Sequence, residues 1–96
     1  MSARSQTFLI RADEHQAMLW GRVLPATWNT LGAAQAGIQV ESRRVYARAL
    51  ADAQALLEAL PDLEPTSALK QAASDLGIPY GDEMGKFVAW AEARLT

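Results

Sequence analysis

The sequence predicts an α+β fold, in which a small N-terminal antiparallel β-meander of two or three strands packs on a long helix and a C-terminal helical hairpin follows. Three observations lead to this fold class. Short apolar segments near the N-terminus are separated by polar residues. Residues 42–60 have the apolar spacing of an amphipathic helix. Two further helical segments, residues 66–77 and 82–95, are joined by a turn that contains proline and glycine.

The meander is predicted over residues 6–41. Residues 7–11 are predicted to form the first strand, and residues 17–24 a second strand after a polar turn at residues 13–16. In residues 34–41, apolar and polar side chains alternate, which is the period of a half-buried third strand. The first strand needs a partner, and only this interpretation supplies one.

A helical interpretation of residues 13–41 is the alternative. Ala17, Trp20 and Leu24 also share one face of a helix that would end before Pro25. Residues 27–36 would then form another short helix, and the whole chain would be an all-α domain of five helices. Residue spacing alone does not decide between the two interpretations.

The long helix is predicted over residues 42–60, where one helical face carries a continuous series of apolar side chains. Ser42 is the expected N-cap, and Pro61 is expected to end the helix. The inward positions are Val45, Tyr46, Ala49, Ala53, Leu56, Leu57 and Leu60.

The helical hairpin is predicted over residues 66–77 and 82–95. Gly77 followed by the apolar Ile78 is typical of a C-terminal cap with its hydrophobic contact. Asp82 is the expected N-cap of the last helix, and Glu83 in its first turn suits the helix dipole.

Composition and charge favour one ordinary globular domain of 96 residues. Half of the residues are apolar, and the 19 alanines favour helix. The absence of cysteine excludes disulfides and thiolate metal sites. No apolar run is long enough for a membrane helix, so the expected location is cytoplasmic, with no membrane partner. The net charge of −2 argues against general nucleic-acid binding.

Catalytic residues are hard to find in this sequence, and we expect it not to be an enzyme. His15 is the only histidine, and no glycine-flanked serine accompanies it as a nucleophile. A metal site would need further ligands near His15 beyond two acidic neighbours. No glycine-rich phosphate loop is present. We therefore predict no catalytic residues, no metal ligands and no cofactor.

A basic cluster and one tryptophan are the candidate partner-binding residues. Arg43, Arg44 and Arg48 are expected in the first turns of the long helix, where cations oppose the helix dipole. Such an unfavourable choice indicates a role in gripping a partner's carboxylates, although solvated arginines are the simpler interpretation. Trp28 lies in a loop-like segment and is a candidate hot spot, or it folds back onto the core. The predicted function is a small non-catalytic protein-interaction module, a regulator or inhibitor; self-association is also open.

The alternative function is DNA binding by residues 67–95. The segment from Leu69 to Asp82, with its Gly77–Ile78 turn, resembles the helix-turn-helix of repressors and transposases. That resemblance implies that the second helix enters the major groove by its N-terminal residues. Here that end carries Asp82 and Glu83, which would face phosphates with the wrong sign, and only Lys86 would attract them.

Overall fold

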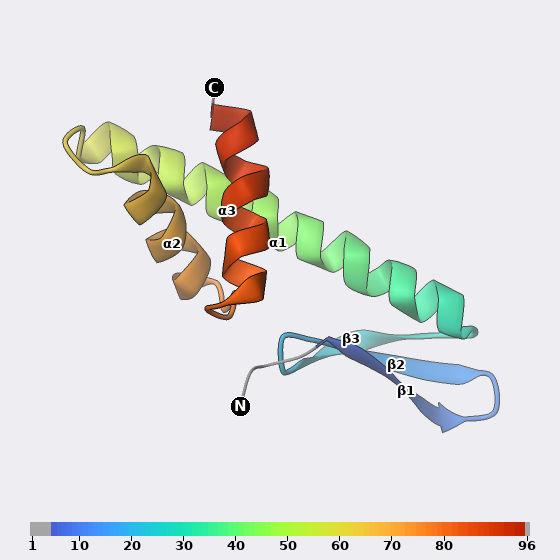
Figure 1. The fold of residues 1–96 in the computed structure, drawn as a ribbon. Coiled ribbons are helices and arrows are strands. Elements are labelled where there is room, and N and C mark those ends of the chain that lie inside the picture. Colours follow the sequence, from blue (N-terminus) through green and yellow to red (C-terminus); the bar gives the residue numbers. More distant parts are fainter. Residues whose placement is uncertain (1–4, 96) are drawn as a thin grey trace. The chain divides into compact units, whose positions relative to one another are not determined.

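The computed structural model describes residues 5–95 and contains a three-stranded antiparallel sheet followed by helices (Figure 1). The strands are β1 (Gln6–Arg11), β2 (Glu14–Leu19) and β3 (Arg22–Trp28), paired in the order β1-β2-β3. The helices are α1 (Leu31–Ala59), α2 (Pro65–Asp75) and α3 (Asp82–Leu95). The α+β class is confirmed, and the all-α alternative is wrong.

The chain divides into two compact units, an N-terminal unit of residues 1–43 and a C-terminal unit of residues 44–96. Helix α1 belongs to both units. Its first turns cover the sheet of the N-terminal unit, and its later turns are part of the C-terminal unit. Whether the two units act as the single domain expected from the sequence stays a prediction. Each unit is described below by itself.

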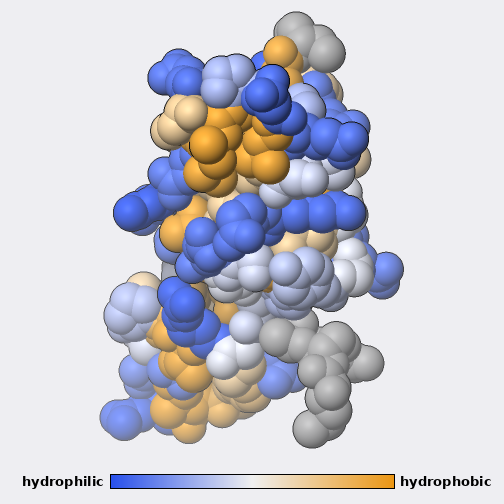
Figure 2. Space-filling view, turned by 90° about the vertical axis from the view of Figure 1, so that its left-hand side faces the viewer, coloured by the Kyte–Doolittle hydropathy of each residue, from blue (hydrophilic) through white to orange (hydrophobic). Residues whose placement is uncertain are grey.

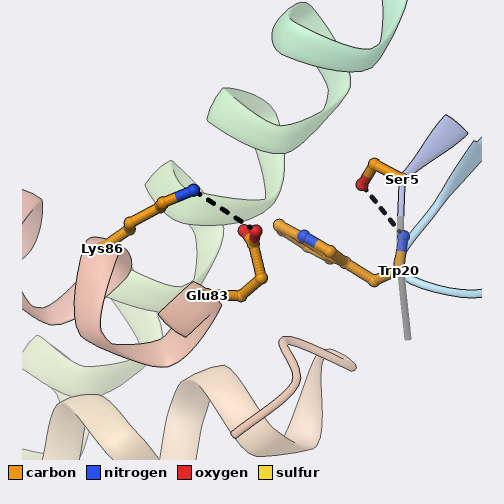
Figure 3. A network of polar contacts seen from close by, with 4 residues as sticks. All are labelled: Ser5, Trp20, Glu83 and Lys86. Atoms are coloured by element: carbon orange, nitrogen blue, oxygen red, sulfur yellow. Dashed lines mark hydrogen bonds and ion pairs between the residues drawn. The ribbon is translucent and has the colours of Figure 1, made fainter. Parts of the chain in front are cut away.

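Two tight turns shape the sheet, and both use left-handed backbone. Asp13 lies between β1 and β2 with a φ of 64°. Trp20 and Gly21 join β2 to β3 with φ values of 50° and 81°, as in a type I′ hairpin turn. The Trp20 N–H donates a hydrogen bond to Ser5 Oγ at 3.3 Å (Figure 3). The predicted single strand over residues 17–24 is therefore wrong, because a turn at Trp20 and Gly21 interrupts it. Tryptophan rarely adopts a positive φ, so this turn is hard to recognise from the sequence.

One face of the sheet packs on α1. Cross-strand partners share a face, so the pairs Thr7–Ala17 and Leu9–His15 place Thr7 and Leu9 of β1 on the same face as His15 and Ala17 of β2. Ala17 on this face is fully buried, and its core cluster includes Leu19, Leu24, Trp20, Trp28 and, from α1, Ile38. The pairs Gln6–Met18 and Phe8–Gln16 lie on the opposite face.

Helix α1 begins at Leu31, so the predicted start at Ser42 and the predicted third strand over residues 34–41 are wrong. Thr30 is the cap, since its Oγ1 accepts a hydrogen bond from the Ala33 N–H at 3.1 Å. Ser42 is buried inside the helix, where its hydroxyl donates to the Gln39 carbonyl at 2.9 Å. Residues 34–41 alternate between apolar and polar side chains, which favours a strand. Ala34 and Ile38 are also four residues apart, so they lie on one face of a helix equally well.

The tightest contact in the N-terminal unit joins Trp28 at the end of β3 to Gly37 of α1. A methyl group at Gly37 would lie 2.7 Å from Cε2 and 3.1 Å from Cη2 of the Trp28 ring, and closer still to Cζ2. Real side-chain carbons do not approach an aromatic ring this closely, so glycine alone lets the ring lie flat against the helix backbone. This close approach holds the end of the sheet on the first turns of α1.

The C-terminal unit is a three-helix arrangement around an aromatic and alanine-rich core. Phe87 and Leu69 are its largest fully buried side chains. Tyr46 meets Phe87 edge-on at 5.2 Å between ring centroids and Trp90 at 5.4 Å. The small side chains that let the helices approach one another are Ala49, Ala53, Ala68, Ala72, Ala73 and Ala91.

The predicted C-terminal cap at Gly77 is present, whereas the predicted N-cap at Asp82 is wrong, because Asp82 is the first residue of α3 and the Gly81 carbonyl accepts from the Gly85 N–H at 3.0 Å. Gly77 has a φ of 89° and donates to the Ser74 carbonyl, while Ile78 donates to the Ala73 carbonyl at 3.0 Å. This is the Schellman pattern, and Ile78 is buried as its hydrophobic contact requires. Helix α2 begins at Pro65, one residue before the predicted start.

Replacing Gly37 with alanine should destabilise the N-terminal unit. We expect Gly37→Ala to lower its free energy of unfolding by about 1–3 kcal/mol, because the indole must move away from the helix. Gly32→Ala in the same helix is the matched control. Apart from the adjacent backbone of its own helix, no atom of the described chain lies within 4 Å of a methyl group at Gly32, so this change should be neutral or stabilise by up to ~1 kcal/mol. Urea unfolding followed by tryptophan fluorescence compares the two, and equal stabilities would contradict the contact.

In the C-terminal unit, Leu69→Ala should be far more costly than Leu60→Ala. Leu69 is fully buried, so its truncation is expected to cost about 3–5 kcal/mol through lost burial and a cavity. Leu60 is 54% exposed, and its truncation should cost about 0.5 kcal/mol or less. Thermal unfolding by circular dichroism measures both, and similar midpoints for the two variants would refute this core.

Candidate functional site

The three candidate arginines lie near the middle of α1 rather than in its first turns. Arg43, Arg44 and Arg48 are all exposed, but a helix that begins at Leu31 places them more than two turns from its N-terminus. The dipole interaction fades within the first turn, so their position carries no electrostatic penalty of that kind. The sequence argument that these arginines oppose the helix dipole, which would indicate a binding role, is therefore wrong. A role of these arginines in binding a partner stays a prediction.

Trp28 is part of the core of the N-terminal unit. It ends β3 rather than lying in a loop, it is half-buried, and its ring lies against Gly37. It packs on the cluster of Ala17, Leu19 and Leu24. The alternative that this side chain folds back onto the core is the one that the structure supports, and its role in binding a partner is untested.

His15 lies in β2, paired with Leu9 on one side and Trp28 on the other, rather than in a turn. Within residues 5–95, no group of three or more histidine, aspartate or glutamate side chains is placed to hold a metal ion. No helix of the described chain is both long and apolar enough to cross a membrane. The absence of catalysis and the cytoplasmic location stay predictions from the sequence.

Strand β1 carries three consecutive exposed apolar side chains. Leu9 is 67% exposed, Ile10 is 45% exposed and Phe8 is 36% exposed. Three consecutive large apolar residues in this state are unusual for a solvated strand. The sequence reasoning used this segment only to find a strand and missed its exposure, because a continuous apolar run is typical of a strand that is buried on both faces.

The free side of β1, which we call the β1 edge, has no neighbouring strand in the described chain, because the sheet order is β1-β2-β3. Four consecutive residues, Gln6 to Leu9, pair regularly with β2, and the register shifts only between Leu9 and Arg11. This stretch therefore presents a regular row of backbone donors and acceptors along its outer side. The Arg11 guanidinium pairs with Glu14 of the neighbouring strand β2 at 3.1 Å and remains exposed.

The other edge of the sheet, along β3, is protected. Pro25 lies within β3 and has no N–H to donate. The pairing of β2 with β3 also shifts register between Gln16 and Met18, which bends the strand. These are devices that natural sheets use against edge-to-edge pairing, so the two edges differ in kind.

An apolar row crosses the sheet on the face turned away from α1. Met18 lies directly opposite Val23, which is 48% exposed, and diagonal to Phe8. Apolar side chains gather at the surface of the sheet in the lower part of the space-filling view (Figure 2). This row ends at β1, so the β1 edge continues an apolar face.

Helices α2 and α3 form the predicted helical hairpin, which is the element that the DNA-binding alternative would use. The charges of this hairpin oppose DNA binding. Asp82 and Glu83 occupy the first turn of α3. Lys86, the cation expected to attract phosphates, pairs with Glu83 at 3.6 Å (Figure 3). The connection from Leu76 to Gly81 is also longer than the three- to four-residue turn of a helix-turn-helix. DNA binding by this hairpin is untested.

Comparison of the chain with models of known families, with curated proteins and with solved structures finds no match. The interpretation of function therefore depends on the residues and surfaces described above.

The stabilities of two variants show which of the candidate partner-binding residues supports the fold. Trp28→Ala should lower the free energy of unfolding of the N-terminal unit by roughly 2–4 kcal/mol, because the ring is part of its core. Arg48→Ala, at an exposed helical position, should change stability by about 0.5 kcal/mol or less. Denaturant titration measures both changes. If Trp28→Ala leaves stability unchanged, the indole does not support the sheet and returns to the set of free surface residues.

Proposed function

We propose that this protein is a small non-catalytic protein-interaction module, a regulator or inhibitor, that binds its partner along the β1 edge. The observation that supports this proposal is the combination in one strand of exposed Phe8, Leu9 and Ile10 with an unpaired edge. Neither property alone is informative, since single exposed apolar residues and short free edges are both common. Their coincidence in the one unprotected edge of the sheet favours an interface.

Strand addition is the binding mode that this surface suits. An extended segment of a partner would form main-chain hydrogen bonds with the outer side of Gln6 to Leu9 and extend the sheet. The affinity would come from the backbone, while side chains on alternating faces would provide specificity. Burial of Leu9 and Phe8 would remove apolar surface from water at about 25 cal/mol per Å².

Nucleic-acid binding is less well supported than protein binding. The chain has a net charge of −2, and a DNA-reading α3 would bring Asp82 and Glu83 toward phosphates. The exposed arginines of α1 are compatible with a second contact to an acidic protein surface, and Arg44→Glu tests that contribution separately.

The test is capture of partners from the native host's lysate by the tagged full-length chain and two matched variants. Leu9→Lys places a charge on the β1 edge, whereas Val23→Lys places the same charge on the protected β3 edge. Both positions are exposed, so both variants should keep the circular dichroism spectrum of the parent. We expect Leu9→Lys to lose the captured protein and Val23→Lys to retain it, with and without nuclease.

Two results would contradict this proposal. Equal capture by all three proteins would show that the β1 edge is not the interface. Loss of all captured protein after nuclease treatment, together with recovery of nucleic acid, would favour the helix-turn-helix alternative of residues 67–95.

A further inference from the structure

We propose that the β1 edge binds the β1 edge of a second copy of this chain, so that two three-stranded sheets join into one continuous antiparallel sheet. This inference rests on the proposed function, because it takes the β1 edge as the interface and names its occupant. Three properties of the strand favour a second copy: the difference between the two edges, the position of the only charge, and the pattern of side chains.

The difference between the edges predicts a closed dimer. If both edges of the sheet could pair, copies would add to one another without limit and form filaments or aggregates. Pro25 and the register shift between Gln16 and Met18 protect the β3 edge. Only β1 is then able to pair, and a surface that pairs with itself about a two-fold axis closes after two copies.

The charge of β1 fits antiparallel pairing with itself. Arg11 is the only charged residue of the strand and lies at its C-terminal end. A two-fold axis perpendicular to the sheet makes the two strands antiparallel, which places the two Arg11 side chains at opposite ends of the interface. Parallel pairing would instead set them side by side, where like charges repel. The ion pair with Glu14 further draws each guanidinium toward its own β2.

The side chains of β1 fit the same arrangement. A two-fold axis of this kind keeps each face of the sheet continuous, so residues opposite one another must share a face. With the axis at Phe8, the two Phe8 rings meet on the apolar face that carries Met18 and Val23. Leu9, the most exposed apolar residue of the strand, then lies opposite Thr7 of the second copy. The arrangement therefore covers the strand where it is most apolar.

The first measurement is sedimentation velocity of the full-length chain over a wide range of concentrations. We expect the parent protein to form a dimer as concentration rises and to form no larger species. Leu9→Lys should weaken this dimer by at least about tenfold, because it removes apolar burial and brings two ammonium groups within reach of each other. Val23→Lys, on the protected edge, should leave the dimer unchanged. A parent protein that remains monomeric at every concentration overturns the inference.

Single-cysteine variants test the register, since the chain has no cysteine of its own. Thr7→Cys, Phe8→Cys and Leu9→Cys are treated with a short thiol cross-linker, and Thr27→Cys on β3 is the matched control. A residue on a two-fold axis lies directly opposite its own copy, so Phe8→Cys should form covalent dimers most efficiently. Thr27→Cys should form no covalent dimer. Equal cross-linking at Thr27, or no cross-linking at any of the three β1 positions, would refute pairing through β1.

The two experiments separate this inference from the proposed function. A monomeric chain whose capture of another protein still depends on Leu9 would overturn self-pairing and leave the β1 edge as an interface for a different strand. If the chain is monomeric and Leu9→Lys captures the same proteins as the parent, both self-pairing and the proposed function of the β1 edge are overturned.

Discussion

The contact of the Trp28 ring with the backbone of Gly37 is the constraint on which the N-terminal unit depends. It connects the last residue of the sheet to the helix that covers it, and it works only because residue 37 has no side chain. The same ring extends the buried cluster of Ala17, Leu19 and Leu24. A small three-stranded sheet needs an apolar face or a packed helix to be stable, and this ring contributes to both.

Coverage of one face leaves the rest of the sheet to solvent. The first turns of α1 bury the face that carries Ala17, but the opposite face keeps Phe8, Met18 and Val23, and β1 keeps a regular free side. Natural sheets commonly protect such edges, and β3 is protected by Pro25 and a register shift. The absence of comparable protection along Gln6 to Leu9 is the physical basis for an interface there.

The C-terminal unit depends on small side chains. Its helices approach closely because buried alanines line the contact, while Tyr46, Phe87 and Trp90 fill the remaining space. Arg94 lies 4.1 Å from the centre of the Trp90 ring and donates to the Trp90 carbonyl, which completes the exposed side of this cluster. Helix α3 of this unit begins with the acidic residues Asp82 and Glu83.

The sequence by itself predicted the β1 strand, both helices of the hairpin and the Gly77–Ile78 cap, because these depend on local chemistry: apolar periodicity, capping groups and the conformational freedom of glycine. It favoured the α+β class, and the structure decided against the all-α alternative. Only the tertiary structure decided where α1 begins, since residues 34–41 fit both a strand and a helix until Gly37 meets Trp28. It also decided the turn at Trp20, the burial of Trp28 and the exposure of β1. Burial and edge position depend on which elements cover which, and no local pattern of residues contains that information.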